Sequence, residues 1–257
     1  IIGSDAGKLT EGVSNTIIIG TSAGAQNMTS DADASVLIGF QAGTAIISGQ
    51  KNTAIGYAAL STNTVGDFNT AIGYESLLLN EPPGATDISG NTAIGCYSGK
   101  NVTEGLHSTF IGYNTASNGS NPLTGLGNTA VGSDSGKKLE GSAEYNTLIG
   151  YTSGIELSTG SNNVIIGYNA GSTAEVLSNS VIIGNSAGAS QMDSDANGTV
   201  AIGVEAANLL TTGQKNTAVG AYSLEAEDDG DYNTAIGYES LQSQTGTSGD
   251  IGNTAVG

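Results

Sequence analysis

A short motif close to Asn-Thr-Ala-Ile-Gly-Tyr recurs along the whole chain, and this repetition constrains the fold more than any other feature. Successive motifs lie 17 to 22 residues apart. A chain that repeats one short unit stacks its units so that each contacts only its neighbours, and it needs no thick globular core. The central glycine of the motif occurs at Gly3, Gly20, Gly39, Gly56, Gly73, Gly95, Gly112, Gly132, Gly150, Gly167, Gly184, Gly203, Gly220, Gly237 and Gly257.

A longer period is superimposed on the short one. Gly3 and Gly167 mark equivalent places, and their offset of 164 residues (167 minus 3) recurs at the following motifs. We therefore expect a single continuous solenoid over residues 1–257, with a repeat unit at 3–166 and a second copy that begins at 167 and is cut off at 257. Since the first and last residues both fall within a motif, we expect the chain to be a segment of a longer fibre.

Few large side chains are available for a core, because the 257 residues include 40 Gly and only 3 Phe, with no Trp. The 24 acidic and 6 basic residues give a formal net charge of −18. This balance argues against binding to nucleic acid or to an anionic membrane surface, because both need Lys and Arg to neutralise phosphates. No stretch approaches the roughly 18 consecutive apolar residues of a membrane span, so we expect no membrane insertion.

The motif alternates with a period of two residues, which predicts a short β-strand. The residue before the glycine is Ile or Val in every copy, as at Ile55 and Ile72. β-Branched residues favour strands, and so uniform a position indicates a common core. Thr53 and Thr70 stand two residues earlier, on the same face of the strand. We therefore expect the Ile and Thr rows to face the inside of the solenoid.

The residue between these rows lies on the opposite face and is also apolar, commonly Ala. A strand that is apolar on both faces is typically buried on both faces. The commonest cover for a repeated surface is the same surface on another chain. We therefore expect an interchain face at Ala54, Ala71 and Ala235.

Three further columns are expected to run along the solenoid. The motif glycine should turn the corner after the strand, where a positive φ or close packing excludes a side chain. The aromatic residue that follows should stack from coil to coil, about 4.8 Å apart. The asparagine that opens the strand should hydrogen-bond its equivalents along the axis, as amide ladders do. Members of these columns are Gly56 and Gly73, Tyr57 and Tyr74, and Asn52 and Asn69.

The strand Asn/Ser-Thr/Val-Ala/Ile-Ile-Gly and the turn after it resemble the head repeat of trimeric autotransporter adhesins, the YadA-like or haemagglutinin-repeat family. They are also similar to repeats of phage tail fibres. The resemblance covers the whole chain. It implies an all-β fold, a left-handed parallel β-solenoid or β-roll with one coil per repeat, and three chains around a common axis. The coils of 17 to 22 residues are longer than those typical of the family.

These features lead us to expect a structural or adhesive fibre, extracellular at a cell surface or on a virion, that self-associates as a homotrimer or filament. Its ligand would be a host surface or a polysaccharide, held by many weak contacts along the chain. The alternative is a phage-type tail fibre that recognises surface polysaccharide. A third class, the ice-binding solenoid, displays rows of Thr, and the expected inward position of Thr53 and Thr70 argues against it.

Catalytic and zinc sites find little support in the residue inventory. The chain has one cysteine, Cys96, and one histidine, His107. A single chain therefore cannot assemble a cysteine–histidine pair with a third partner of those types, or a zinc site with conventional ligands. Cys96 takes a place that is usually aromatic, and we interpret it as a packed small residue. We expect no catalytic activity and no cofactor.

One segment resembles the first half of a calcium loop, in which alternating oxygen ligands converge on one ion. Its candidate ligands are Asp193, Asp195 and Asn197. The twelfth position, where a bidentate acid is expected, holds Val204, so a solvated turn is the alternative interpretation. A second acidic run at residues 225–231 is another candidate for cation binding, or else a solvated loop.

Overall fold

The structure, a computed structural model, describes residues 1–84, 88–245, 249–250 and 252–257. It contains two compact units, which are described one at a time. Unit 1 comprises Ile1–Asn128 with Glu140–Ser142, and unit 2 comprises Thr129–Leu139 with Ala143–Gly257. The described residues contain no helix long and apolar enough to cross a bilayer.

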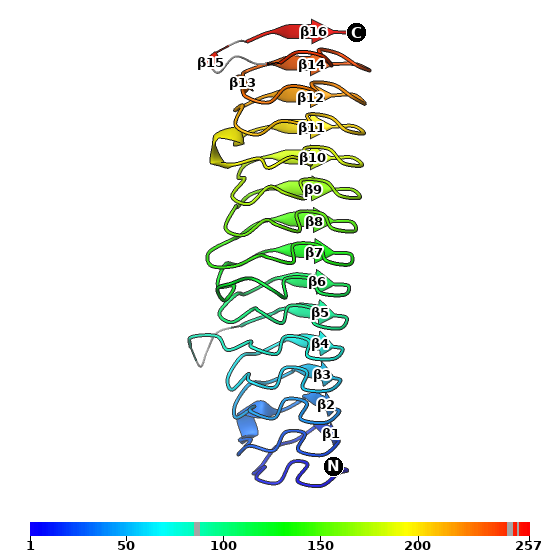
Figure 1. Ribbon diagram of the computed structural model, residues 1–257. Coiled ribbons are helices and arrows are strands. Elements are labelled where there is room, and N and C mark those ends of the chain that lie inside the picture. Colours follow the sequence, from blue (N-terminus) through cyan, green and yellow to red (C-terminus); the bar gives the residue numbers. More distant parts are fainter. Residues whose placement is uncertain (85–87, 246–248, 251) are drawn as a thin grey trace. The chain divides into compact units, whose positions relative to one another are not determined.

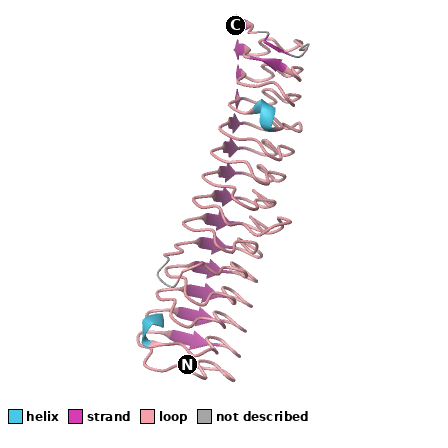
Figure 2. Ribbon diagram, turned by 90° about the vertical axis from the view of Figure 1, so that its left-hand side faces the viewer, coloured by secondary structure: helices cyan, strands magenta, loops and turns pink. Residues whose placement is uncertain are grey.

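In unit 1 the motif segments form three-residue strands that pair in parallel and in chain order (Figures 1 and 2). Identical motif positions face each other, so that Thr53 pairs with Thr70 and Ile55 with Ile72. A short 3₁₀ turn, η1 (Ser30–Ala32), lies in one spacer. The strands are β1 (Ile17–Ile19), β2 (Val36–Ile38), β3 (Thr53–Ile55), β4 (Thr70–Ile72), β5 (Thr92–Ile94) and β6 (Thr109–Ile111).

Unit 2 repeats this arrangement. Its 3₁₀ turn η2 (Ser194–Ala196) is 164 residues after η1 (194 minus 30), which matches the longer sequence period. Its strands are β7 (Thr129–Val131), β8 (Thr147–Ile149), β9 (Val164–Ile166), β10 (Val181–Ile183), β11 (Val200–Ile202), β12 (Thr217–Val219), β14 (Thr234–Ile236) and β16 (Thr254–Val256), with β13 (Gly230–Asp231) paired to β15 (Gly249–Asp250). The predicted all-β, parallel β-solenoid with one coil per repeat is thus confirmed.

The middle residue of each strand faces the interior of its coil. Ala54, Ala71 and Ala235 are fully buried within the single chain. The prediction that these alanines form an interchain face is therefore wrong, because their side chains have no surface left for another chain to contact. The inside of a coil is narrow, and a small side chain fits it between residues that project from the spacers, such as Leu60 and Leu77.

The first and third residues of each strand consequently point away from the interior. Thr53, Ile55, Thr70 and Ile72 are only half-buried. The prediction that the Thr and Ile rows line the core is wrong as well, since side chains alternate strictly across a strand and the Ala row already occupies the inside. β-Branched residues suit either face of a sheet, so their uniformity does not identify the core.

The glycine column is confirmed, and both expected reasons for it apply. Gly56 and Gly73 each have a φ of +139°, in the region that favours glycine. A Cβ atom on Gly56 would lie 2.3 Å from the carbonyl oxygen of Gly73, and a Cβ on Gly73 would lie 2.3 Å from that of Gly95. Neighbouring coils therefore touch backbone to backbone at this corner, and any side chain would hold them apart.

The asparagine column is buried, but its hydrogen bonds differ from the expected amide ladder. Asn52 donates from Nδ2 to the carbonyl oxygen of Gly66 at 2.8 Å and accepts at Oδ1 from the backbone N–H of Asn69 at 2.8 Å. An amide-to-amide bond also occurs, from Asn163 Nδ2 to Asn146 Oδ1 at 3.0 Å. Most of these side chains thus connect the backbone of one coil to the backbone of the next, satisfying groups that the short strands leave unpaired.

Candidate interaction surface

The most extensive surface feature of each unit is the outer face of its sheet, which consists of the first and third residues of the strands. In unit 1 all of these residues are Thr, Val or Ile, and none is charged. The outer face of unit 1 comprises Ile17, Val36, Thr53, Thr70, Thr92 and Thr109 in one row and Ile19, Ile38, Ile55, Ile72, Ile94 and Ile111 in the other.

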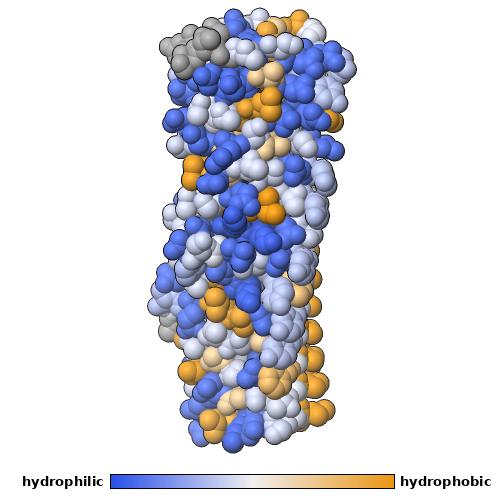
Figure 3. Space-filling model, in the orientation of Figure 1, coloured by the Kyte–Doolittle hydropathy of each residue, from blue (hydrophilic) through white to orange (hydrophobic). Residues whose placement is uncertain are grey.

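The outer face remains accessible in the single chain. Ile17, Ile94 and Ile111 are 50%, 38% and 37% exposed. Hydrophobic side chains project in a row at the right-hand edge of Figure 3, beside the coils of unit 1. A contiguous apolar surface of this kind on a soluble protein is typical of an interaction site.

The threonine hydroxyls of the outer face differ from those of the spacers. Spacer threonines such as Thr62 and Thr103 donate to backbone carbonyl oxygens of the next coil. Within the described part of the chain, no side-chain hydrogen bond engages the hydroxyls of Thr53, Thr70 or Thr92. These hydroxyls are therefore available to solvent or to a partner.

An aromatic column follows the glycine corner, beside the outer face. Phe40 stacks on Tyr57 with ring centroids 5.2 Å apart and planes at 15°, and Tyr57 stacks on Tyr74 at 4.9 Å and 8°. The stacking expected for Tyr57 and Tyr74 is thus confirmed. Further along, Tyr97 meets Tyr74 edge-on at 5.3 Å, and Tyr113 continues the series at 6.4 Å from Tyr97. We call these five residues the aromatic column.

Cys96 occupies the usual aromatic position, directly after Gly95, and is half-buried. Its neighbour Tyr97 takes over the aromatic contact from the next position, which it reaches with a φ of +58°. The small thiol thereby leaves room for Tyr97 to turn edge-on to the rings on either side.

Charged groups lie at one point of the aromatic column. Lys100 forms an ion pair with Glu75 at 2.7 Å, and its Nζ lies 4.8 Å from the centroid of the Tyr97 ring. A hydrogen bond to the Glu75 carboxylate is the main cause that raises the pKa of Tyr74 above its ordinary value. The bond favours the neutral phenol, and the negative charge of Glu75 adds to the effect.

Unit 2 has shorter aromatic stacks. Tyr151 and Tyr168 stack with centroids 5.7 Å apart at 10°. Tyr222 and Tyr238 meet edge-on at 6.1 Å. Between these pairs, the place after the motif glycine is taken by Asn185 and Val204.

The calcium candidates Asp193, Asp195 and Asn197 serve the backbone instead of converging on one point. Asp193 caps η2, because its side chain accepts a hydrogen bond from the N–H of Asp195 at 2.8 Å. Asn197 accepts at Oδ1 from the N–H of Ser178, in the preceding coil, at 2.6 Å. Asp195 is exposed. This geometry gives the calcium hypothesis no support and fits a solvated, capped turn.

Asn197 belongs to a polar row that sequence reasoning missed. Two residues before the asparagine column, a side-chain oxygen accepts the otherwise unpaired backbone N–H of the preceding coil. Asp67 accepts from Gln50 at 2.8 Å, and Asp231 accepts from Gln214 at 2.9 Å. Ser178 accepts from Ser161 at 3.0 Å. The signal was present in the sequence as oxygen-bearing residues at one fixed motif position.

The acidic run at 225–231 brings carboxylate oxygens of Glu227, Asp228 and Asp229 within 4.8 Å of one another. Glu227 is fully buried, and it accepts hydrogen bonds from the N–H of Gly230 at 2.7 Å and from Gln244 Nε2 at 2.9 Å. Its carboxylate therefore holds a spacer corner in place, where other coils have residues such as Leu210.

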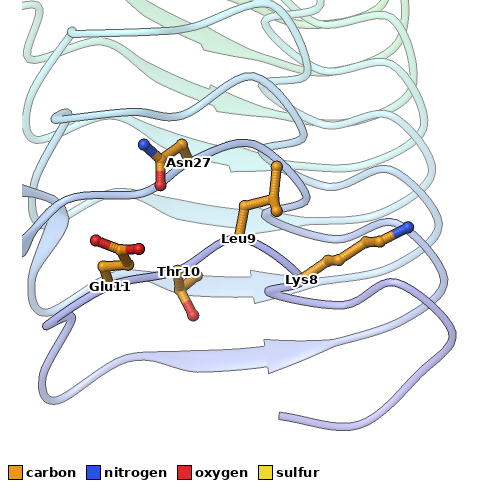
Figure 4. A pocket seen from close by; sticks show the side chains of 5 residues that line it. All are labelled: Lys8, Leu9, Thr10, Glu11 and Asn27. Atoms are coloured by element: carbon orange, nitrogen blue, oxygen red, sulfur yellow. The ribbon is translucent and has the colours of Figure 1, made fainter.

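Surface hollows add no second site. One of about 420 Å³ is lined by Lys8, Leu9, Thr10, Glu11 and Asn27, whose polar groups point in different directions (Figure 4). Another, of about 670 Å³, includes Asp31, Asp33 and Asp67. Asp33 and Asp67 both accept backbone N–H groups there, which accounts for their presence.

Comparison of the chain with family models, curated proteins and solved structures finds no match. Function therefore has to be argued from the surface itself. The two features that extend over several coils are the outer face and the aromatic column.

Proposed function

We propose that the chain is a segment of a structural or adhesive fibre, extracellular at a cell surface or on a virion, without catalytic activity. Copies of the chain associate through the outer face as a homotrimer, with the left-handed coil of the adhesin repeats that it resembles. The observation that carries this proposal is the uncharged double row of β-branched residues, which extends from β1 to β6 in unit 1.

The charge distribution favours a second copy as the occupant of the outer face. A formal charge of −18 makes copies of the chain repel each other over most of their surfaces. The outer face is free of charge, so it is where close approach costs least. Two copies also share the same coil spacing, about 4.8 Å, so their rows can interdigitate in register over many coils. β-Branched side chains lose little rotamer freedom when they pack.

Such a fibre would act by avidity. A repeated surface presents many equivalent weak contacts, and their combined affinity exceeds that of any single one. The ligand would be a host surface or a polysaccharide. A phage-type tail fibre that recognises surface polysaccharide is the alternative source of the same architecture.

A charge placed on the outer face tests the proposal. In Ile94→Asp, each copy would have to bury an unpaired carboxylate in an apolar seam, so we expect the dissociation constant of the trimer to rise by roughly 100-fold or more. Analytical ultracentrifugation over a range of concentrations measures this change. Ile94 is only 38% exposed, but its side chain points outward, so the single chain should still fold.

Leu79→Asp is the matched control, because Leu79 is 39% exposed and lies in a spacer of unit 1, away from the outer face. We expect it to associate like the unmodified chain. Equal association of the unmodified chain and Ile94→Asp would show that the seam lies elsewhere. Circular dichroism spectra of both variants confirm that the comparison concerns folded chains.

The outward position of the Thr row favours ice binding as a second candidate function. Rigid rows of threonine hydroxyls and isoleucine methyl groups present a regular surface to ordered water, and the hydroxyls of Thr53, Thr70 and Thr92 have no partner among the described side chains. Ice binding requires the outer face to be open in solution. A monomeric chain that shows thermal hysteresis would favour ice binding over self-association.

A further inference from the structure

The aromatic column of unit 1 is unusually accessible. Phe40, Tyr57, Tyr74 and Tyr113 are 42% to 50% exposed. Parallel rings in full face-to-face contact would lie about 3.5–4 Å apart. The centroid distances of 5.2 and 4.9 Å therefore mean that the rings are offset, so that each leaves part of its face open.

We infer that the aromatic column is a binding surface for a neutral, β-linked linear polysaccharide that lies along the column. The flat faces of such sugars carry C–H groups that pack on aromatic rings, while their hydroxyls point sideways. The column offers one ring per coil over consecutive coils, and a polymer of repeated rings can match this periodicity. A compact protein partner has no comparable linear array.

Polar groups beside the rings suit the sugar hydroxyls. The Glu75–Lys100 pair supplies an acceptor and a donor at the point where the ring of Tyr97 turns edge-on. The Tyr57 hydroxyl adds a group that can donate and accept. Aromatic faces combined with a few placed polar groups are typical of small-molecule recognition sites.

The electrostatics select a neutral polymer. Glu75 balances the charge of Lys100, so the column carries no excess of positive charge. The net charge of −18 repels anionic polysaccharides at longer range. This inference deepens the attachment role proposed above, and it does not depend on the trimer.

Affinity electrophoresis of the full 257-residue chain in native gels tests it. The probes are hydroxyethylcellulose, glucomannan and mixed-linkage β-glucan, with alginate as the anionic comparison. We expect at least one of the three neutral glycans to retard the chain and alginate to have no effect. Tyr57→Ala interrupts the column at its centre, so it should weaken the retardation roughly tenfold, the loss expected for one stacking ring. Tyr57→Phe keeps the ring and should bind within about twofold of the unmodified chain.

Tyr151→Ala is the matched control, because Tyr151 is 53% exposed but belongs to the short stack of unit 2. It should leave binding unchanged. The inference is overturned if none of the three glycans retards the chain, if alginate does so more strongly, or if Tyr57→Ala binds as well as the unmodified chain. Ultracentrifugation of the same samples separates the two proposals, because glycan binding by a monomer would contradict the trimer and leave the column as the binding surface.

Discussion

Replacing Gly73 with alanine is expected to lower the free energy of unfolding by about 2–6 kcal/mol, the combined cost of a strained backbone and an overpacked contact. The new Cβ would lie 2.3 Å from the carbonyl oxygen of Gly95, and Gly73 has a φ of +139°. The obstructing atom belongs to the backbone of the next coil, so it cannot move aside unless the two coils separate. Urea unfolding followed by circular dichroism measures the change.

Gly12→Ala separates the effect of the clash from that of the positive φ. Gly12 has a φ of +74°, but the nearest atom to its added Cβ would be 3.7 Å away, on Ser30. We expect this control to cost only about 1–2 kcal/mol, the penalty of a left-handed conformation. Equal destabilisation by the two substitutions would mean that the close approach of the coils at Gly73 contributes nothing.

Loss of a column asparagine is expected to have the second-largest effect. Asn163 is fully buried; it donates to the carbonyl oxygen of Leu177 at 2.6 Å and accepts from the N–H of Ser180 at 3.1 Å. Asn163→Ala leaves both backbone groups without these partners, and each buried unsatisfied group costs about 1–3 kcal/mol. We therefore expect a loss of about 2–6 kcal/mol, measurable by urea unfolding.

Asn163→Ser grades this effect. The column already contains Ser at position 180, where its hydroxyl accepts from the N–H of Thr199 at 3.2 Å. The serine variant can therefore restore the bond to Ser180, and it should lose less stability than the alanine variant. Asn185→Ala, at an exposed site in the same unit, is the control and should change stability by less than about 0.5 kcal/mol. If alanine and serine at position 163 were equivalent, the hydrogen bond to Ser180 would carry no weight.

The repeat was sufficient to predict the parallel pairing and its register, because identical residues in successive coils can only align with one another. It did not identify which strand face is inside. Thr53 and Ile55 form an apolar row that resembles a core, whereas Ala54 is small enough to fit either side. The useful signal was Asn52, which shares a face with Ala54. Its amide has partners only inside, where strands of three residues leave backbone groups unpaired.

The candidate sites were predictable to different degrees. Tyr57 and Tyr74 stack as expected, since their spacing follows from the coil repeat alone. The edge-on turn at Tyr97 depends on the small Cys96 beside it, which is a packing effect that the motif does not encode. The calcium pattern at Asp193 and Asn197 arose because a cap and a member of the polar row happen to alternate along the sequence.

Self-association through the outer face is tested most directly by the molar mass of the unmodified 257-residue chain in solution, measured by size-exclusion chromatography with multi-angle light scattering. We expect three times the mass of the chain, and the mass of a single chain for Ile94→Asp. The outer face of a monomer would leave Ile94 and Ile111 open to water. An unmodified chain that elutes with the mass of one chain at every concentration would contradict the proposal.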